Sequence, residues 1–156
     1  MPTESLIREH TTLNKGILIG YSGGPDSTAL VHLLSSLKAY QEIDVKAIHI
    51  NHNLSKHSAM WENHCIETCS KLNINLITES IEIKVDGGGL ESASRKARYR
   101  VFEKILNAGD QLLLGHHSDD VAETLFMRLL RGTGPDGMEG PKLQRSLGKG
   151  VLIRPF

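Results

Sequence analysis

A short loop of small and polar residues is the first place in the chain that could do chemistry. It consists of Ser22, Gly23, Gly24, Pro25, Asp26 and Ser27. The two glycines let backbone N–H groups approach an anion without interference from Cβ atoms. The two serines add hydroxyl donors, and the helix expected next would point its positive end at the same place. The loop therefore favours a phosphate group as its ligand. The alternative is an ordinary tight turn in which Asp26 or Ser27 caps the helix.

A second candidate group is the acidic segment HHSDDVAET, where an apolar run ends and a helical pattern begins. Asp120 and Glu123 are three residues apart and Asp119 and Glu123 are four apart, and either spacing puts two carboxylates on one helix face. These carboxylates could hold Mg²⁺, bind an amine or accept a proton, or they could only complement the helix dipole. His116 and His117 could pack or bind a metal. Because no cysteine or third histidine is placed with them, orientation or substrate contact is favoured.

Strand-like and helical patterns alternate along the chain and must position these two groups. Apolar or alternating runs predict strands at 16–21, at 45–50, within 74–83, at 111–115 and at 151–153. Patterns of period 3.6 predict helices at 26–40, 58–72, 90–106 and 118–130. Residues 132–150 contain six glycines and two prolines, which predicts a loop. The alternation predicts an α/β protein with a Rossmann-like parallel sheet of about five strands and helices on both faces.

The predicted sheet would bring both candidate groups to the same edge, at the carboxyl ends of its strands. In such sheets, ligands bind outside the carboxyl ends of the strands, where loops lead into helix N-termini. The glycine loop follows the first predicted strand and the acidic segment follows the fourth. We therefore expect the two groups to face one crevice.

The length of 156 residues suits a single domain over 1–156, with residues 1–14 as a lead-in. No apolar run approaches the roughly 18 residues that a membrane-spanning helix needs. The N-terminus also lacks the pattern of a secretion signal. We therefore expect a cytoplasmic protein that does not enter a membrane.

The charge of the chain is balanced in total but not along its length. The formal net charge is zero, which argues against a domain that holds nucleic acid by bulk electrostatics alone. Residues 1–94 carry 7 Lys and Arg against 11 Asp and Glu, a net charge of −4. Residues 95–156 carry 11 against 7, a net charge of +4. Phosphate groups are thus expected to meet the second half.

The glycine loop belongs to neither of the two commonest nucleotide-binding types, since the chain has no GxxxxGKS/T and no GxGxxG motif. It resembles instead the PP-loop, SGGxDS, of the ATP pyrophosphatases, enzymes that cleave ATP between the α- and β-phosphates and adenylate a substrate. The match is complete, with Pro25 at the free position. The resemblance implies an adenine nucleotide alpha hydrolase-like fold with ATP and Mg²⁺ as cofactors. The loop would hold the pyrophosphate, and Asp26 would help to hold the metal.

Further segments resemble one narrower family, the tRNA(Ile)-lysidine synthases. They are HINHNL at 49–54, ESASR at 91–95 with Arg98 and Tyr99 after it, HHSDDVAET at 116–124, LLRGTG at 129–134 and IRPF at 153–156. The resemblance covers nearly the whole chain from residue 16 onward. It implies an ATP-dependent carbon–nitrogen ligase whose partners are tRNA(Ile) with a CAU anticodon and free L-lysine. The wobble cytidine is adenylated on O2, and the lysine ε-amine then displaces AMP from C2.

The same resemblance implies roles for individual residues. Asp120 would bind the lysine ammonium and take its proton, with Asp119 and Glu123 on Mg²⁺ or in support. Arg95 would stabilise charge at the α-phosphate. Contacts to ligands are expected from His49, Asn51 and His52 around adenine and ribose, and from His116, His117, Arg128 and Arg131 around lysine and tRNA. Exposed arginines on a helix are more often solvated, which is the alternative for Arg128 and Arg131. Val121 stands where the family commonly has Gln.

Two other functions remain open at this point. A tRNA 2-thiolase of the PP-loop type would need a persulfide or cluster near the site, which Cys65 and Cys69, on a helix expected to be remote, do not supply. A nucleotide-binding module without chemistry of its own is the second alternative. The family continues beyond the position of Phe156 with tRNA-binding domains, so the resemblance predicts the catalytic N-terminal part. Trp61 is expected to be a packing residue, and a homodimer stays open.

Overall fold

Six strands and three helices make up the part of the chain that the structure, a computed structural model, describes. These residues are 11–12, 15–40, 42–53, 55–85, 89–115 and 144–155. The strands are β1 (Ile17–Gly20), β2 (Val45–Asn51), β3 (Asn75–Ser80), β4 (Gln111–Leu114), β5 (Gln144–Leu147) and β6 (Gly150–Ile153). The helices are α2 (Pro25–Tyr40), α3 (Ser58–Lys71) and α4 (Gly89–Ile105).

All six strands form one sheet, in the order β3-β2-β1-β4-β6-β5. Every neighbouring pair is parallel except β5 and β6, which are antiparallel. Strand β1 lies in the middle, with Ile17 paired to Val45 of β2 on one side and to Gln111 of β4 on the other. The chain therefore builds the sheet outward from β1 in one direction and then returns to build it in the other. The carboxyl ends of β1 and β4 meet at this change of direction, where α/β sheets commonly bind ligands.

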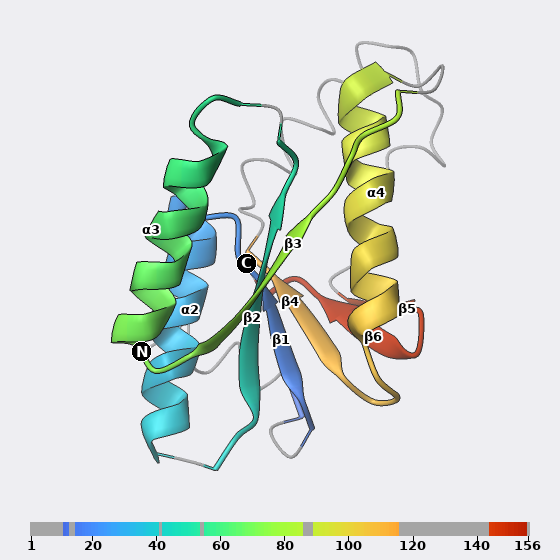
Figure 1. Cartoon of the computed structure of the whole chain (residues 1–156). Helices are drawn as coiled ribbons and strands as arrows, with labels where there is room; N and C mark the ends of the chain where they lie inside the picture. The colour runs from blue at the N-terminus through green and yellow to red at the C-terminus, as the bar shows by residue number, and fades with distance from the viewer. Residues whose placement is uncertain are drawn as a thin grey trace, which may run out of the picture.

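Helices cover both faces of the sheet, as Figure 1 shows, with α2 and α3 on one side and α4 on the other. The alternation of side chains along β1 explains why both faces are apolar. Ile17 and Ile19 belong to the core cluster shared with α2 and α3. Leu18 between them belongs to the second cluster, with Phe102 of α4. A strand that is buried on both faces needs a continuous apolar run, and this is the pattern that predicted it.

The predicted strands at 16–21, 45–50, within 74–83, at 111–115 and at 151–153 are confirmed with small changes at their ends. The helices predicted at 26–40, 58–72 and 90–106 are also confirmed. Proline suits the first position of a helix, which explains why α2 begins at Pro25 rather than one residue later. None of the described helices is both long and apolar enough to cross a membrane. The helix predicted at 118–130 lies outside the described residues.

The prediction of a loop over 132–150 is wrong for its last part. Residues 144–150 include strand β5 and the turn into β6, so the described sheet has six strands rather than about five, and one is antiparallel. Gly148 adopts a φ of +55° in this turn. A Cβ atom at Gly150 would lie 2.5 Å from the carbonyl oxygen of Asp110. Gly148 therefore allows the hairpin turn and Gly150 allows a close approach of two backbones, so these glycines are compatible with a strand pair. Residues 132–143 lie outside the described part.

Candidate functional site

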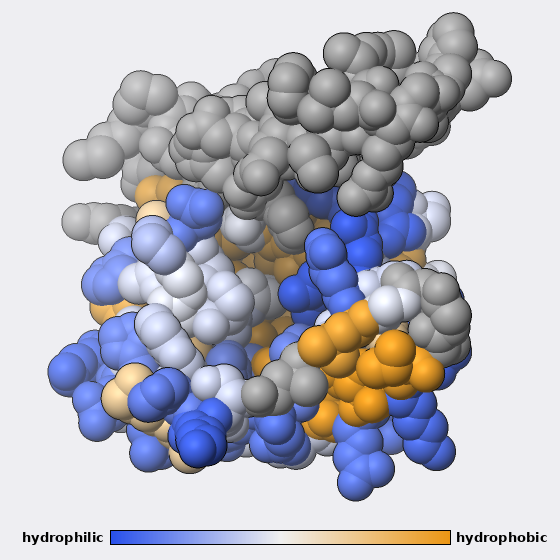
Figure 2. Space-filling model, turned by 90° about the horizontal axis from the view of Figure 1, so that it is seen from above, coloured by the Kyte–Doolittle hydropathy of each residue, from blue (hydrophilic) through white to orange (hydrophobic). Residues whose placement is uncertain are grey.

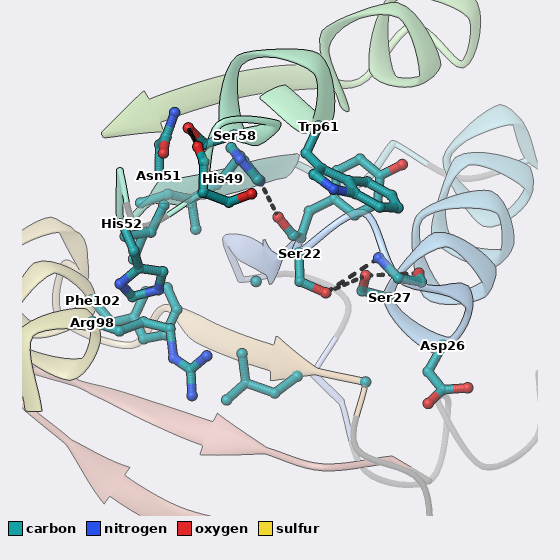
Figure 3. A pocket seen from close by; sticks show the side chains of 18 of the residues that line it. Ser22, Asp26, Ser27, His49, Asn51, His52, Ser58, Trp61, Arg98 and Phe102 are labelled. Atoms are coloured by element: carbon teal, nitrogen blue, oxygen red, sulfur yellow. Dashed lines mark hydrogen bonds between the residues drawn. The ribbon is translucent and has the colours of Figure 1, made fainter. Parts of the chain in front are cut away.

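A cavity of about 520 Å³ opens at the carboxyl ends of the central strands (Figure 3). Its size lies in the range of sites for small molecules. Figure 2 looks onto the molecule from above and shows hydrophobic surface at depth between more polar sides. The lining comes from the loop after β1, the ends of β2 and β4, and the helices α3 and α4. It includes Ser22, Asp26, Ser27, Ile48, His49, Asn51, His52, Ser58, Trp61, Arg98, Phe102 and Gly115.

The glycine loop predicted to bind phosphate lines this cavity and is ordered by its own hydrogen bonds. The hydroxyl of Ser27 donates to the carbonyl oxygen of Gly24 over 3.0 Å, and the backbone N–H of Gly24 donates to Ser22 Oγ over 3.3 Å. The two serine oxygens lie 3.0 Å apart. Helix α2 begins at Pro25, within the second half of the loop, and the first N–H groups of a helix have no partner within it. The loop and helix start together form a cradle that suits an anion.

Gly23 lies where a side chain would be strained, for two independent reasons. Its φ is +86°, a conformation that residues with side chains rarely adopt. A Cβ atom there would lie 3.1 Å from Cys65 Sγ and 3.4 Å from Trp61 Cε3. Helix α3 is therefore packed directly against the loop, and the expectation that Cys65 is remote from the site is wrong. The cause is the strand order, because β2 lies beside β1 and brings the helix that follows it next to the loop.

Cys65 and Cys69 are free and buried, as expected for reduced structural thiols. Burial raises the pKa of the Cys65 thiol to about 12, with smaller contributions from Cys69 and Glu62. Burial also raises the pKa of Cys69 to about 11. Since the thiolate is the reactive form, neither cysteine suits nucleophilic or metal chemistry at neutral pH.

Two of the three polar residues at the end of β2 are held by neighbouring groups. His49 is buried and its Nδ1 lies 2.9 Å from the carbonyl oxygen of Tyr21, which requires a proton on Nδ1. Asn51 donates from Nδ2 to Glu62 Oε2 over 2.7 Å. The Oδ1 of Asn51 accepts the N–H of Asn53, which has a φ of +52°. Both residues thus shape the wall of the cavity, and His49 still has a second ring nitrogen.

His52 and Arg98 present buried polar atoms that lack a partner. The Nδ1 of His52 and the Nε of Arg98 have no hydrogen-bond partner among the described residues. Burial lowers the pKa of His52, and the positive charge of Arg98 and the nearby His49 lower it further. Burial also lowers the pKa of Arg98, although a guanidinium stays charged. Buried polar groups are nearly always paired, so both atoms are available to a partner that enters the cavity.

Arg98 was not singled out from the sequence, whereas Arg95 was. Arg98 lines the cavity and is shown beside His52 in Figure 3. Arg95 is exposed, is absent from the lining, and lies with its Cζ 5.6 Å from the centre of the Tyr99 ring. The helical phase carried the signal, because Arg98 and Phe102 are four residues apart and share a face of α4. Trp61 was also underestimated, since it lines the cavity and is 49% exposed.

The acidic segment HHSDDVAET, residues 116–124, lies entirely outside the described residues. The expected site residues His116, His117, Asp119, Asp120, Glu123, Arg128 and Arg131 all lie outside the described residues, as does Val121. Gly115 immediately before them lines the cavity. Within the described ranges there is no group of three or more His, Cys, Asp or Glu side chains that could hold a metal ion.

Three comparisons relate the chain to known proteins. The family model of PP-loop domains, an ATP-binding family, matches residues 3–156. The tRNA(Ile)-lysidine synthase of Alkalilimnicola ehrlichii is 42% identical over 98% of this chain, and that of Coxiella burnetii is 41% identical over 98%. In both cases the match covers 35% of the relative, so the chain spans about a third of the length of these proteins.

A solved structure shares the fold at much lower sequence identity. It is the U34-tRNA thiolase NcsA from Methanococcus maripaludis with its 4Fe-4S cluster. The TM-score is 0.72 over 99% of this chain and 58% of that one, with 18% sequence identity. At this identity the likeness concerns the fold alone. It agrees with the α/β architecture of a mostly parallel sheet.

Proposed function

The chain belongs to the PP-loop domain family, and from this premise we propose that it performs the ATP-dependent steps of a tRNA(Ile)-lysidine synthase. The observation that carries the proposal is the cavity in which the loop of residues 22–27 faces the unpartnered atoms of His52 and Arg98. One side of this cavity suits a leaving pyrophosphate and the other offers a fixed positive charge. The identity of 41–42% with lysidine synthases supports the choice of reaction.

The bound ATP is proposed to run across the carboxyl ends of the strands. Its β- and γ-phosphates would accept hydrogen bonds from the loop and from the first N–H groups of α2. The nucleoside would lie against the apolar end of β2, where Ile48 and Ile50 line the cavity beside His49. The α-phosphate would then come within reach of Arg98. We assign the charge-stabilising role expected of Arg95 to Arg98, because Arg98 is the arginine of the two that lines the cavity.

The reaction proceeds in two displacements. The O2 atom of the wobble cytidine attacks the α-phosphorus, and the bond to the pyrophosphate oxygen breaks. The ε-amine of lysine then attacks C2 of the adenylated base and AMP leaves. Negative charge that develops on the phosphate oxygens is stabilised by Arg98 and by the N–H groups at the start of α2. Asp120, with Asp119 and Glu123, remains the proposed acceptor for the lysine ammonium and its proton.

The cavity could hold a magnesium ion if the phosphate oxygens of ATP supply some of its ligands. Mg²⁺ is commonly held by one or two carboxylates together with phosphate oxygens and water. Asp26 lies in the first turn of α2 and lines the cavity, so its carboxylate meets that requirement. Asp119 is the second proposed ligand. When bound, the ion would neutralise charge on the leaving pyrophosphate.

The proposal includes the setting of the reaction. Residues 1–156 would form one catalytic domain of a cytoplasmic enzyme, and the partners would be tRNA(Ile) with a CAU anticodon and free L-lysine. Parts of the relatives that this chain does not cover would add contacts to the tRNA. A homodimer is compatible with this proposal and is not required by it.

The test is an assay of pyrophosphate and AMP release from ATP by this chain. Pyrophosphate release that needs tRNA with a CAU anticodon, and AMP release that needs lysine as well, are the expected results. ATP binding without any release would favour the nucleotide-binding module instead. Release driven by a sulfur donor in place of lysine would favour a thiolase. The buried, high-pKa cysteines Cys65 and Cys69, the two cysteines of the chain, argue against that last outcome.

A further inference from the structure

Three arginines converge on Tyr99, a partly buried residue of α4. The guanidinium of Arg95 lies 5.6 Å from the centre of the Tyr99 ring, and that of Arg145 lies 5.0 Å from it. Arg154 donates from its terminal nitrogen to the Tyr99 hydroxyl over 3.1 Å. We call Arg95, Tyr99, Arg145 and Arg154 the arginine–tyrosine cluster. It joins helix α4 to strand β5 and to the residue that follows strand β6.

Two exposed members of the cluster, Arg95 and Arg145, bring positive charge together with no counter-charge among the described residues. Among the residues that the structure describes, no carboxylate lies within salt-bridge distance of Arg95 or Arg145. Burial alone would raise the pKa of Tyr99, but Arg154, Arg145 and Arg95 together bring it below its ordinary value. Like charges held this close repel one another, and an anion placed over them relieves the repulsion.

The guanidinium groups of Arg95 and Arg145 are also oriented in advance. The face of an aromatic ring attracts a cation, so Tyr99 keeps both groups near one place. Both arginines are exposed, which leaves their N–H donors accessible from solvent. A planar guanidinium matches the oxygens of a phosphate with two parallel hydrogen bonds. The cluster is therefore suited to an oxyanion, such as a phosphate, that approaches from solvent.

Helix α4 contributes residues to both the cluster and the cavity. Tyr99 packs edge-on against Phe102, with ring centres 6.0 Å apart, and Phe102 lines the cavity. Arg98, directly before Tyr99 in the chain, lines the cavity as well. A polymer that placed one nucleotide in the cavity would therefore run its adjoining backbone over α4.

We propose that the arginine–tyrosine cluster binds the phosphodiester backbone of the RNA substrate next to the nucleotide that enters the cavity. The inference rests on the proposed function for the identity of the polymer. It adds a binding surface on β5, a strand that was absent from the sequence prediction. Three of the 11 Lys and Arg residues that give residues 95–156 a net charge of +4 belong to this cluster.

The test compares two variants of equal charge in RNA binding. The probe is a fluorescently labelled RNA stem-loop with a CAU anticodon, and its affinity is measured between about 50 and 200 mM salt. Arg145→Gln is expected to weaken binding roughly fivefold or more at low salt and to reduce the salt slope by about one. Arg100→Gln, an exposed arginine of α4 outside the cluster, is the control and should change binding less than about twofold.

Further measurements separate the remaining explanations. Arg145→Gln should leave the affinity for ATP unchanged, whereas a loss of ATP binding would mean that the cluster holds the nucleotide and would overturn the proposal. Equal RNA affinity in the two variants, or no RNA binding by the wild-type chain, would also overturn it. Arg145→Lys, which keeps the charge but not the planar group, should bind with intermediate affinity. RNA binding through the cluster without lysine-dependent AMP release would refute the proposed function alone.

Discussion

Gly115 and Asp26 approach each other so closely that a Cβ atom on Gly115 would lie 3.0 Å from the carbonyl carbon and oxygen of Asp26. The end of β4 therefore rests against the first turn of α2, backbone against backbone. Ser27 N would lie at the same distance from that Cβ atom. This contact fixes the start of α2, and with it the loop, relative to the edge of the sheet.

Gly115→Ala is expected to weaken both the fold and nucleotide binding. The added methyl group meets backbone atoms, which cannot rotate away, so α2 must shift. Overpacking of this kind costs about 1–3 kcal/mol in unfolding free energy. For a chain of this size that corresponds to a fall in Tm of a few degrees. Thermal unfolding and calorimetric ATP titration check the prediction, and an unchanged Tm with unchanged affinity would contradict it.

Gly24→Ala should separate binding from stability. A Cβ atom at Gly24 would meet only Ser22 Oγ among the described residues, at 3.5 Å, which is an ordinary contact. The fold should therefore tolerate it, with a change in Tm of less than about two degrees. The methyl group would stand in the cradle proposed for phosphate, and ATP affinity should fall roughly tenfold or more. Full ATP affinity in this variant would argue that phosphate lies elsewhere.

Arg98→Gln should slow the adenylation step far more than Arg95→Gln does. A donor aimed at charge in the transition state typically contributes about 100-fold to 1000-fold in rate. Arg98 lines the cavity with an unpartnered Nε, whereas Arg95 lies over Tyr99. Single-turnover pyrophosphate release gives the two rates. If Arg95→Gln were the slower variant, the role implied by the family resemblance would return to Arg95.

His52 should titrate below the ordinary histidine range in the free chain. Burial, Arg98 and His49 all lower its pKa, so the imidazole is neutral at pH 7. A phosphate bound beside it would favour the charged form and raise that pKa, so ATP should bind more tightly as the pH falls through this range. NMR titration of the His52 ring with and without ATP measures both values. Identical midpoints would place the phosphates away from His52.

The buried thiols make stability depend on alkaline pH. Cys65 and Cys69 ionise at a pH of about 12 and about 11 in the folded chain and near 9.0 in the unfolded one. The folded state thus holds more protons between pH 9 and 12, and stability is lost as the pH rises through this window. The slope of unfolding free energy against pH should become smaller when both cysteines are replaced by alanine.

The same thiols should resist alkylation at pH 8 in the folded chain. Their thiolate content is lower than that of the unfolded chain, and reaction with iodoacetamide should be roughly 100-fold slower or more. Mass spectrometry of native and denatured samples checks this expectation. Equal rates in the two samples would show that the helix carrying these residues opens readily.

The fold could be predicted wherever burial leaves a pattern in the sequence. Strand β1 is buried on both faces and appears in the sequence as a continuous apolar run. Helix α2 begins with a proline, which favours the first position of a helix. Strand β5 leaves no such pattern, because Gln144, Arg145 and Ser146 are exposed and Leu147 is its one buried residue. Its pairing with β6 creates the strand, and pairing between segments cannot be read from local composition.

The candidate site was predictable where chemistry is local and less so where it depends on packing. The loop of residues 22–27 carries its glycines and hydroxyls in one short stretch, and it lines the cavity. The sequence placed Arg98 on the same helix face as Phe102, but only the packing of α4 against the sheet shows that this face borders the cavity. The position of Cys65 beside Gly23 depended on the order of the strands, which local patterns do not determine.

Trp61, the single tryptophan of the chain, gives the molecule a built-in optical reporter. Its ring stands 3.4 Å from where a Cβ atom of Gly23 would be. The residue is about half exposed and lines the cavity. If phosphate binds in the loop as proposed, the polarity around this indole is expected to change. The emission of one residue therefore follows occupancy of the loop directly, with no dye attached and no second chromophore of its kind to obscure the signal.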